Sequence, residues 1–313
     1  MIETDVLIIG AGPAGSFCAA HLVRNGVNCI VLDKSDFPRF KPCAGWVTPG
    51  VLKTLRLKPD DYPLGLTHFS SFDISINGFQ FKLPTNQYSI RRFEFDAWLL
   101  KSSGADFRVH QVKSIENRDG RYVIDGEYSA KYLVGAAGTH CPVARTFFPT
   151  RDPARLIVAM EEEFEFLITD PACKLWFFEE RLPGYAWYVP KVNGILNVGI
   201  GAVEGSLKKR GASLKDYWEK FTSKLHNGGL VRDHNYHASG HSYYLHRNLV
   251  NPRLGNAFLV GDSLGLSTLD MGEGIGPALQ SGRMAAESIL TGKLYQPWRI
   301  TRYSFPSILG LRP

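Results

Sequence analysis

The chain has 313 residues, of which 44 % are hydrophobic and 21 % are charged, and its formal net charge is +6. That length allows two domains with a substantial core, and the composition is that of an ordinary soluble globular protein. The positive charge is scattered. Its one dense run, Lys208-Lys209-Arg210, has no interleaved aromatic residues, so we expect no nucleic acid partner.

The cysteines and the apolar runs restrict the compartment. Five cysteines are an odd number without a C-x-x-C pair, which argues against a disulfide framework and a zinc site. The N-terminal apolar run is too short for a signal peptide, and no stretch reaches the roughly 18 apolar residues that span a bilayer. We therefore expect reduced thiols, a cytoplasmic location and, where the protein meets a membrane, peripheral contact only.

The apolar pattern at the start of the chain predicts a β-α-β unit. Residues 5–9 form a buried strand, residues 13–25 a helix that ends near Gly26, and residues 29–32 a second buried strand. Residues 37–63, rich in proline and glycine, predict an extended loop with a short helix.

The middle of the chain predicts mostly antiparallel strands. Asn77-Gly78 separates two strands of a β-hairpin, at 69–76 and 79–83. Met, Glu and Phe residues alternate over 157–166 as in a half-exposed strand. The other predicted elements are helices at 93–102, 214–225 and 276–290, strands around Trp176, Tyr188 and Asn197, short strands that end with 132–134, and a buried strand at 257–260.

The segment Gly10-Ala11-Gly12-Pro13-Ala14-Gly15 places G-x-G-x-x-G where the first strand passes into the helix. Gly10 permits a tight turn, Gly12 lets the backbone approach a pyrophosphate, and Gly15 lets the helix pack on the strand. Asp33, at the end of the second strand, is placed to accept a hydrogen bond from a ribose hydroxyl; its other interpretation is a solvated strand-end carboxylate. In this setting the motif predicts a dinucleotide site.

A second glycine-rich turn follows the strand at 257–260. Gly261-Asp262 comes directly after that strand, and Gly272-Glu273-Gly274-Ile275-Gly276 leads into the next helix. Asp262 suits ribityl hydroxyls, and the amides near Gly274 suit a flavin ring or a phosphate. A purely structural loop explains these residues equally well, so the identity of the dinucleotide stays open at this point.

Six segments together resemble the geranylgeranyl reductase family, within the p-hydroxybenzoate hydroxylase superfamily of FAD proteins. They cover nearly the whole chain in the order of the family. The segments are Gly10 to Gly15; Pro38-Arg39-Phe40-Lys41-Pro42-Cys43-Ala44-Gly45; Arg92-x-x-Phe95-Asp96; Tyr185-Ala186-Trp187-Tyr188-Val189-Pro190-Lys191 with Val198-Gly199-Ile200-Gly201; Gly261-Asp262; and Gly272-Glu273-Gly274-Ile275 with Ala278-Leu279-x-Ser281-Gly282.

The resemblance implies an α/β fold in which a Rossmann-type FAD-binding domain carries an inserted, mostly antiparallel β-sheet substrate domain. We expect residues 1–65, 88–150 and 247–313 in the FAD-binding domain, and 66–87 and 151–246 in the sheet domain. The expected FAD contacts are Gly10, Gly12, Pro13, Ala14, Gly15, Asp33, Lys34, Lys41, Cys43, Ala44, Gly45, Arg92, Gly138, Gly261, Asp262, Gly272, Gly274 and Ile275, with no metal.

In this family, FAD-bound reductases saturate isolated carbon–carbon double bonds of prenyl chains, so the resemblance implies a hydrophobic lipid substrate. It also implies catalytic roles for Cys43, Tyr185 and Trp187. Cys43 lies near two cations, Arg39 and Lys41, and positive charge favours the thiolate; an inert buried cysteine is the alternative. Tyr185 and Trp187 lie two apart on a strand, so their rings share a face, as core residues or as the wall of a prenyl site.

Two departures from the pattern bear on the electron donor and the substrate. Ala137 stands where superfamily hydroxylases carry an Asp that engages reduced nicotinamide, so both NAD(P)H and a reduced protein carrier stay open as donor. The chain ends soon after Asp262, whereas family reductases continue into a helical region, so we expect a more open pocket or completion by a partner or membrane.

Three alternatives share the scaffold: a flavin monooxygenase, a halogenase and an electron-transfer flavoprotein without an alkene substrate. Halogenases carry W-x-W-x-I-P, and Tyr185 breaks that motif here. Monooxygenases do not need the Cys43 loop. Alkene reduction therefore remains the leading hypothesis.

Overall fold

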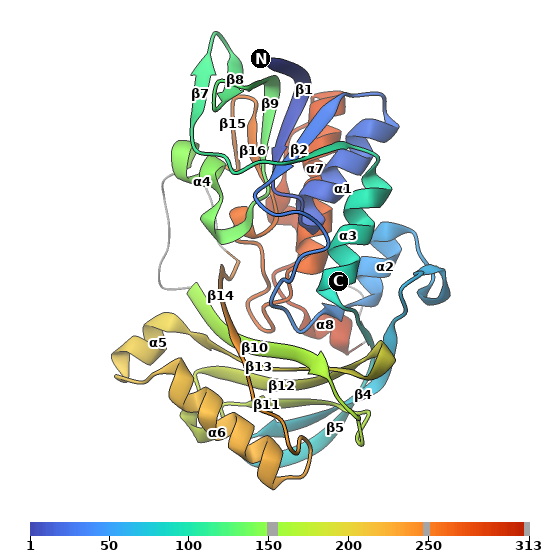
Figure 1. The fold of residues 1–313 in the computed structure, drawn as a ribbon, viewed down its shortest axis with the longest axis vertical. Coiled ribbons are helices and arrows are strands. Elements are labelled where there is room, and N and C mark those ends of the chain that lie inside the picture. The colour runs from blue at the N-terminus through green and yellow to red at the C-terminus, as the bar shows by residue number, and fades with distance from the viewer. Residues whose placement is uncertain (149–155, 247–250, 310–313) are drawn as a thin grey trace. The chain divides into compact units, whose positions relative to one another are not determined.

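The computed structural model describes residues 1–148, 156–246 and 251–309 (Figure 1). The chain divides into two compact, discontinuous units. The first unit comprises residues 1–40, 93–151 and 244–304, and the second comprises 41–92, 152–243 and 305–313. Residues 41–65, 88–92 and 305–313, which we expect in the FAD-binding domain, cluster with the second unit, and residues 244–246, which we expect in the sheet domain, cluster with the first.

The first unit is built on a sheet with the strand order β15-β16-β9-β1-β2-β6. All neighbouring strands from β16 to β6 in this order are parallel. Aliphatic side chains fill its central strands, as expected for a parallel sheet buried on both faces. An antiparallel pair, β7 and β8, extends from β9. The strands are β1 (Ile2–Ile9), β2 (Cys29–Asp33), β6 (Asp106–Val109), β7 (Ile115–Arg118), β8 (Arg121–Ile124), β9 (Tyr128–Gly135), β15 (Arg253–Leu254) and β16 (Ala257–Leu259).

Two helices far apart in the sequence, α1 (Pro13–Arg24) and α7 (Ile275–Thr291), lie side by side in the first unit (Figure 1). A Cβ atom on Gly282 would lie 2.3 Å from the carbonyl oxygen of Ala14, so only glycine permits this approach. The other helices of this unit are α3 (Arg92–Ser103) and α4 (Pro142–Phe147). Gly282, quoted above in a family motif, therefore serves helix packing.

The second unit is built on a sheet in the order β14-β10-β13-β12-β11-β4-β5-β3. From β10 to β3, neighbouring strands pair antiparallel except for the parallel β11–β4 pair. Its strands are β3 (Trp46–Val47), β4 (Thr67–Ile76), β5 (Phe79–Ser89), β10 (Leu156–Glu165), β11 (Cys173–Phe177), β12 (Gly184–Lys191), β13 (Ile195–Val203) and β14 (Ser239–Tyr244). Short helices α2 (Pro49–Leu55), α5 (Glu204–Lys209) and α8 (Phe305–Ile308) accompany the sheet.

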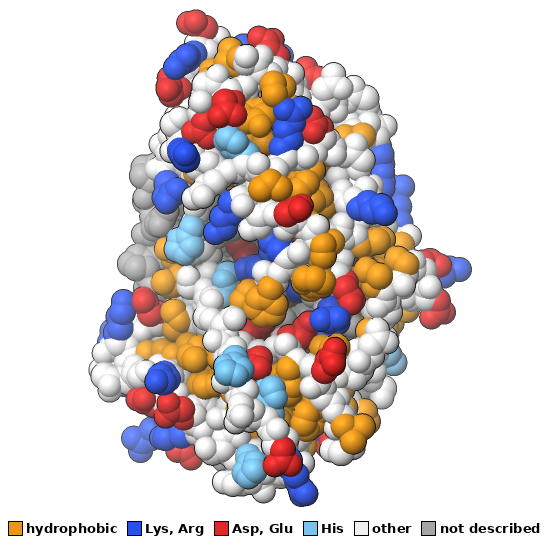
Figure 2. Space-filling view, viewed as in Figure 1, with side chains coloured by type: hydrophobic (Ala, Val, Ile, Leu, Met, Phe, Trp, Pro, Cys, Tyr) orange, Lys and Arg blue, Asp and Glu red, His pale blue; other side chains and the backbone are white. Residues whose placement is uncertain are grey.

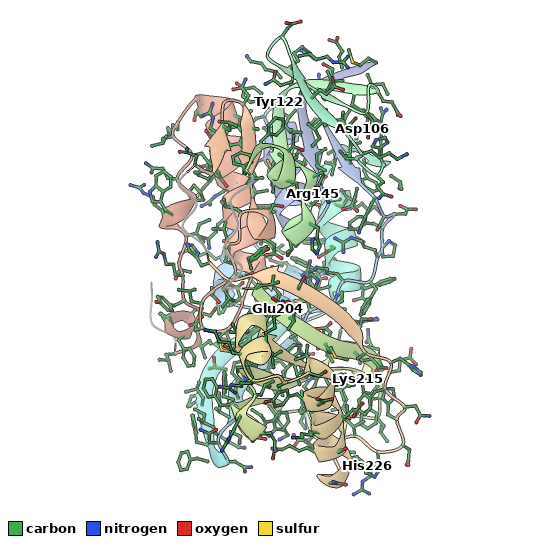
Figure 3. The ribbon with its side chains drawn as sticks, turned by 90° about the vertical axis from the view of Figure 1, so that its left-hand side faces the viewer. Asp106, Tyr122, Arg145, Glu204, Lys215 and His226 are labelled. Carbon is green, nitrogen blue, oxygen red and sulfur yellow. The ribbon has the colours of Figure 1, made fainter. Side chains whose placement is uncertain are left out.

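The longest helix of the second unit, α6 (Leu214–Asn227), packs against one face of this sheet. Lys215 and His226 lie near its two ends in Figure 3. Its apolar stripe of Trp218, Phe221 and Leu225 is buried in the same cluster as the even-numbered residues of β13. The odd-numbered residues of β13 face the other side of the sheet, where the candidate site described below is found.

Most predicted elements occur close to their expected places. The hairpin is the β4–β5 pair, and Asn77 and Gly78 of its turn both have positive φ, at 49° and 87°, as a two-residue hairpin turn requires. The half-exposed strand at 157–166 is β10, and its buried residues are Ile157, Ala159 and Glu161, the last with an exposed fraction of 2 %. Within the described ranges, every helix is too short or too polar to cross a membrane.

Candidate active site

The glycine loop occupies the junction of β1 and α1. Gly10 has φ of +111°, and a Cβ atom there would lie 2.5 Å from the carbonyl carbon of Ala136. A Cβ atom on Gly15 would lie 1.9 Å from the carbonyl oxygen of Gly10. At Gly12, by contrast, a Cβ atom would meet only the Arg39 guanidinium, at 3.7 Å. The chain's own packing thus demands glycine at the first and third positions and leaves the middle one open.

The N-terminus of α1 has the properties of an anion site. Among the described residues no side chain caps it, and its first turn contains no acidic residue, so its amide groups remain available to a phosphate. Asp33 ends β2, where its Oδ2 accepts a hydrogen bond from the Ala11 amide at 2.9 Å and its Oδ1 accepts one from the Ser35 amide at 3.1 Å. Asp33 thus braces the loop, and its contact with a ribose stays a prediction. Lys34 beside it is exposed.

The second glycine-rich turn lies against the N-terminal turn of α1. Gly261 has φ of +58°, and a Cβ atom on it would lie 3.0 Å from the Ala14 side chain. Its amide donates to Ser281 Oγ at 2.9 Å, and the Gly138 amide donates to Ser263 Oγ at 2.9 Å. Turns from three distant parts of the first unit therefore converge on the glycine loop.

Asp262 and the start of α7 complete this group of turns. Asp262 Oδ1 accepts a hydrogen bond from Ser267 Oγ at 3.2 Å, and a Cβ atom on Gly274 would lie 3.3 Å from that oxygen. Gly272 and Ile275 flank Gly274 at the helix start. Glu273 beside them is a carboxyl that our site prediction omitted; burial raises its pKa to about 7, and it accepts a hydrogen bond from the Gly276 amide.

These features of the first unit fit FAD. The open middle glycine and the uncapped helix suit a diphosphate, Asp33 suits a ribose, and Asp262 with the nearby amides suits the ribityl chain and ring. The described part of the chain contains no group of three or more His, Cys, Asp or Glu side chains that could hold a metal.

The remaining predicted cofactor residues lie in the second unit or at its edge. Arg92 is 8 % exposed and begins α3. Lys41 Nζ lies 3.2 Å from His241 Nδ1. Gly45 has φ of +70°, and a Cβ atom there would lie 2.0 Å from the carbonyl oxygen of Ile90, so the loop of residues 41–45 rests tightly on the end of β5.

Cys43 is the one cysteine of the five that is not buried. Its Sγ accepts a hydrogen bond from the Gly45 amide at 3.3 Å, and its own backbone amide donates to the carboxylate of Glu161 on β10. The next residue, Ala44, lines a pocket. Cys43 therefore directly precedes a residue that lines the pocket, and it is not part of the core.

The pocket lies on the face of the sheet opposite α6 and is partly open to solvent. Tyr185 and Trp187 lie on it as predicted, with ring centroids 5.7 Å apart. Trp187 is buried, whereas Tyr185 is half-buried. The wall is mostly apolar and aromatic; its other members include Trp46, Phe69, Phe72, Leu175 and Val189.

A polar network borders this apolar pocket, and our sequence analysis missed it. The Trp187 indole donates to Asn197 Oδ1 at 2.7 Å, and Asn197 Nδ2 donates to Glu161 Oε1 at 3.4 Å. Next to it, Glu163 accepts from Lys191 Nζ at 2.6 Å and from Arg91 Nε at 2.9 Å. The sequence held one signal for it: two carboxylates spaced by two on a single strand.

Burial and charge move the two carboxyl groups of β10 in opposite directions. Burial raises the pKa of Glu161 to about 7, although Lys191 and the hydrogen bonds oppose that rise. Burial also acts to raise the pKa of Glu163, but the charges and hydrogen bonds of Lys191 and Arg91 outweigh it and hold the pKa below its usual value. Glu161 therefore takes up a proton far more readily than its neighbour.

Comparison with known proteins shows that two family models match parts of the chain. The model of an FAD binding domain matches residues 3–57, and that of the geranylgeranyl reductase catalytic domain matches residues 158–233. The first match covers the glycine loop and Asp33, and the second covers Glu161, Tyr185, Trp187 and Asn197.

Relatives extend the similarity over the full chain. An uncharacterized protein of Methanosarcina barkeri is 31 % identical, over 100 % of this chain and 82 % of its own length. Digeranylgeranylglycerophospholipid reductase 3 of Methanosphaera stadtmanae is 27 % identical, over 92 % and 78 %. A geranylgeranyl bacteriochlorophyll reductase-like structure from Thermoplasma acidophilum shares the fold, with a TM-score of 0.79 at 21 % identity over 93 % and 80 %. The chain therefore belongs to the geranylgeranyl reductase family of FAD-dependent oxidoreductases.

Proposed function

We propose that the protein reduces isolated carbon–carbon double bonds of an isoprenoid chain, with FAD as its redox cofactor. The observation that carries this proposal is the aromatic pocket of the second unit, with Tyr185 and Trp187 on its wall and the Cys43 loop at its edge. An apolar concave site suits a prenyl chain, because such a chain offers hydrocarbon and almost no hydrogen-bonding groups. The names of the relatives point to the same substrate class.

FAD, when bound and reduced, supplies a hydride. Transfer of the Cys43 thiol proton to one alkene carbon would leave positive charge on the other carbon, and the aromatic faces of Tyr185 and Trp187 would stabilise a cation held against them. The hydride would then be added to that second carbon. The π bond is replaced by two C–H bonds, and the thiolate regains its proton from solvent.

We further propose a reduced protein carrier as the electron donor. Ala137 lies two residues after the end of β9, at the position where hydroxylases of the superfamily carry an Asp. It offers no carboxylate to engage a nicotinamide. The test is anaerobic addition of NADPH or of a reduced one-electron carrier protein to the FAD-loaded enzyme. Bleaching of the flavin by NADPH as fast as by the carrier would contradict this choice.

The central experiment is to photoreduce the FAD-loaded protein without oxygen and add a geranylgeranyl lipid. We expect reoxidation of the flavin and a product two hydrogens heavier for each bond reduced. The Cys43→Ala variant should lose most of this activity, whereas Cys29→Ala, which removes a core thiol of the first unit, should keep it.

Two outcomes would favour other functions, and a third would change the assigned proton donor. Insertion of oxygen after exposure to air would indicate a monooxygenase, and reoxidation only by protein partners would indicate an electron carrier. Full activity of the Cys43→Ala variant would exclude the thiol as the proton donor.

A further inference from the structure

A single buried carboxyl group, that of Glu161, connects the Cys43 loop to Trp187 in the wall of the pocket. Glu161, 2 % exposed, accepts hydrogen bonds from the backbone amide of Cys43 and from the side chain of Asn197. Cys43 and Glu161 are 118 residues apart in the sequence, so this contact exists only in the folded chain. A carboxylate placed there must repay a desolvation cost, and its hydrogen bonds show what it holds.

The second connection leads to Trp187. Strand pairing places Glu161, Gly199 and Trp187 in one row across β10, β13 and β12. A Cβ atom on Gly199 would lie 2.2 Å from Cζ2 of the indole, so the ring lies directly over this glycine. In that orientation Nε1 reaches Asn197 Oδ1, and Asn197 in turn reaches Glu161. The indole plane is thereby fixed from two sides.

The charged surroundings of Glu161 support this arrangement. Lys191, whose side chain is fully buried, and Glu163 act on Glu161 from the neighbouring positions of the sheet. Arg91 binds the far oxygen of Glu163. On this face of the sheet the apolar pocket and the charged groups of Glu161, Glu163, Lys191 and Arg91 lie next to each other. Trp187 lies between them, as a residue of the pocket wall that also belongs to the polar network.

We infer that Glu161 is a positioning residue, which holds the Cys43 loop and, through Asn197, the Trp187 indole in fixed relation to each other. This inference rests on the proposed function: the thiol and the aromatic face must meet the same carbon–carbon bond. Proton delivery depends steeply on such geometry, because a displacement of about 1 Å lowers rates by roughly a hundredfold. Glu161 itself does not touch the reacting atoms in this scheme.

The test compares three variants of the FAD-loaded protein. Glu161→Ala removes the acceptor, Glu161→Gln keeps an acceptor oxygen for the Cys43 amide, and Glu162→Ala serves as the matched control. Glu162 is the next residue of β10 but points to the other face, where it accepts from His234 and from the backbone amide of His237. The Glu162→Ala variant therefore also loses a hydrogen-bonded carboxylate, but one that lies away from the pocket.

The first measurement is the rate at which iodoacetamide alkylates Cys43, followed by peptide mass spectrometry. The other four thiols are buried, so the reagent reports on this loop. We expect Glu161→Ala to raise the rate about tenfold, as expected for the loss of one hydrogen bond to a charged group. Glu161→Gln and Glu162→Ala should stay within about twofold of the wild type.

The second measurement is alkene reduction, resolved into kcat and KM. We expect Glu161→Ala to lower kcat at least tenfold with little change in KM, and Glu161→Gln to restore most of it. Unchanged alkylation in Glu161→Ala, or an equal kcat loss in Glu162→Ala, would overturn the inference while leaving alkene reduction intact. If the wild type reduces no alkene, the proposed function fails, and the alkylation series still decides whether Glu161 holds the loop.

Discussion

Replacement of Glu161 by Gln should change how the stability of the protein depends on pH. Burial raises the pKa of Glu161 from 4.5 to about 7 in the folded chain. The folded state therefore binds more protons than the unfolded state between these values, and the free energy of unfolding falls as the pH rises through this window. The stabilisation that comes from the protonated Glu161 side chain is complete below pH 4.5 and is lost above pH 7. Glutamine carries no titrating proton, so the variant lacks this loss.

The size of the effect follows from the shift. A difference between 4.5 and about 7 corresponds to about 3 kcal/mol, since each pKa unit is worth about 1.4 kcal/mol. Most of this change in the free energy of unfolding occurs between pH 5 and pH 8. The stability of Glu161→Gln relative to the wild type should therefore rise by roughly 2 to 3 kcal/mol over that interval.

Urea unfolding followed by tryptophan fluorescence measures this difference. Trp46, Trp176, Trp187 and Trp218 lie in the second unit, so the signal reports mainly on the unit that contains Glu161. Glu162→Gln is the control, because that carboxylate pairs with His234 on the other face of the strand. A relative stability of Glu161→Gln that stays constant from pH 5 to pH 8 would refute the reasoning.

Three further substitutions test other parts of the structure. Gly199→Ala drives a Cβ atom into the Trp187 indole; we expect a loss of about 1–3 kcal/mol in urea unfolding and lower alkene reduction, and an unchanged kcat would count against the fixed indole. Gly15→Ala places a Cβ atom 1.9 Å from the Gly10 carbonyl oxygen, so FAD affinity in a fluorescence titration should fall at least tenfold; wild-type affinity would contradict the proposed cofactor loop. Tyr236→Phe removes a buried hydroxyl that has no hydrogen-bond partner among the described residues, so the free energy of unfolding should rise by about 1 kcal/mol, and a clear fall would reveal a partner.

Charges of both signs are mixed on the face of the molecule that Figure 2 shows. Figure 2 shows Lys and Arg side chains interspersed with Asp and Glu over the face in view, without a broad patch of one sign. Recognition in the proposed function then depends on the apolar wall of the pocket, where Phe72, Leu175 and Trp187 lie.

Local sequence patterns were sufficient for much of the fold. The β1-α1-β2 unit, the hairpin at Asn77-Gly78 and helix α6 each depend on a periodicity or a turn within a few residues, and such signals survive in a single sequence. The glycine loop is a further case. The roles predicted for Gly10 and Gly15, a tight turn and close packing, match the space around them.

Only the tertiary structure decided which residues surround the candidate site. Glu161 lies in a run of three glutamates on β10, and the predicted half-exposed strand did not say which of them is buried. The folded sheet buries the carboxyl of Glu161, because the Cys43 loop covers this end of the face and Asn197 donates a hydrogen bond to it. Contacts between residues 118 apart leave no periodicity in the sequence. The sequence alone thus determined the nucleotide loop and the strands, whereas strand register and long-range packing determined the network that links Cys43 to Trp187.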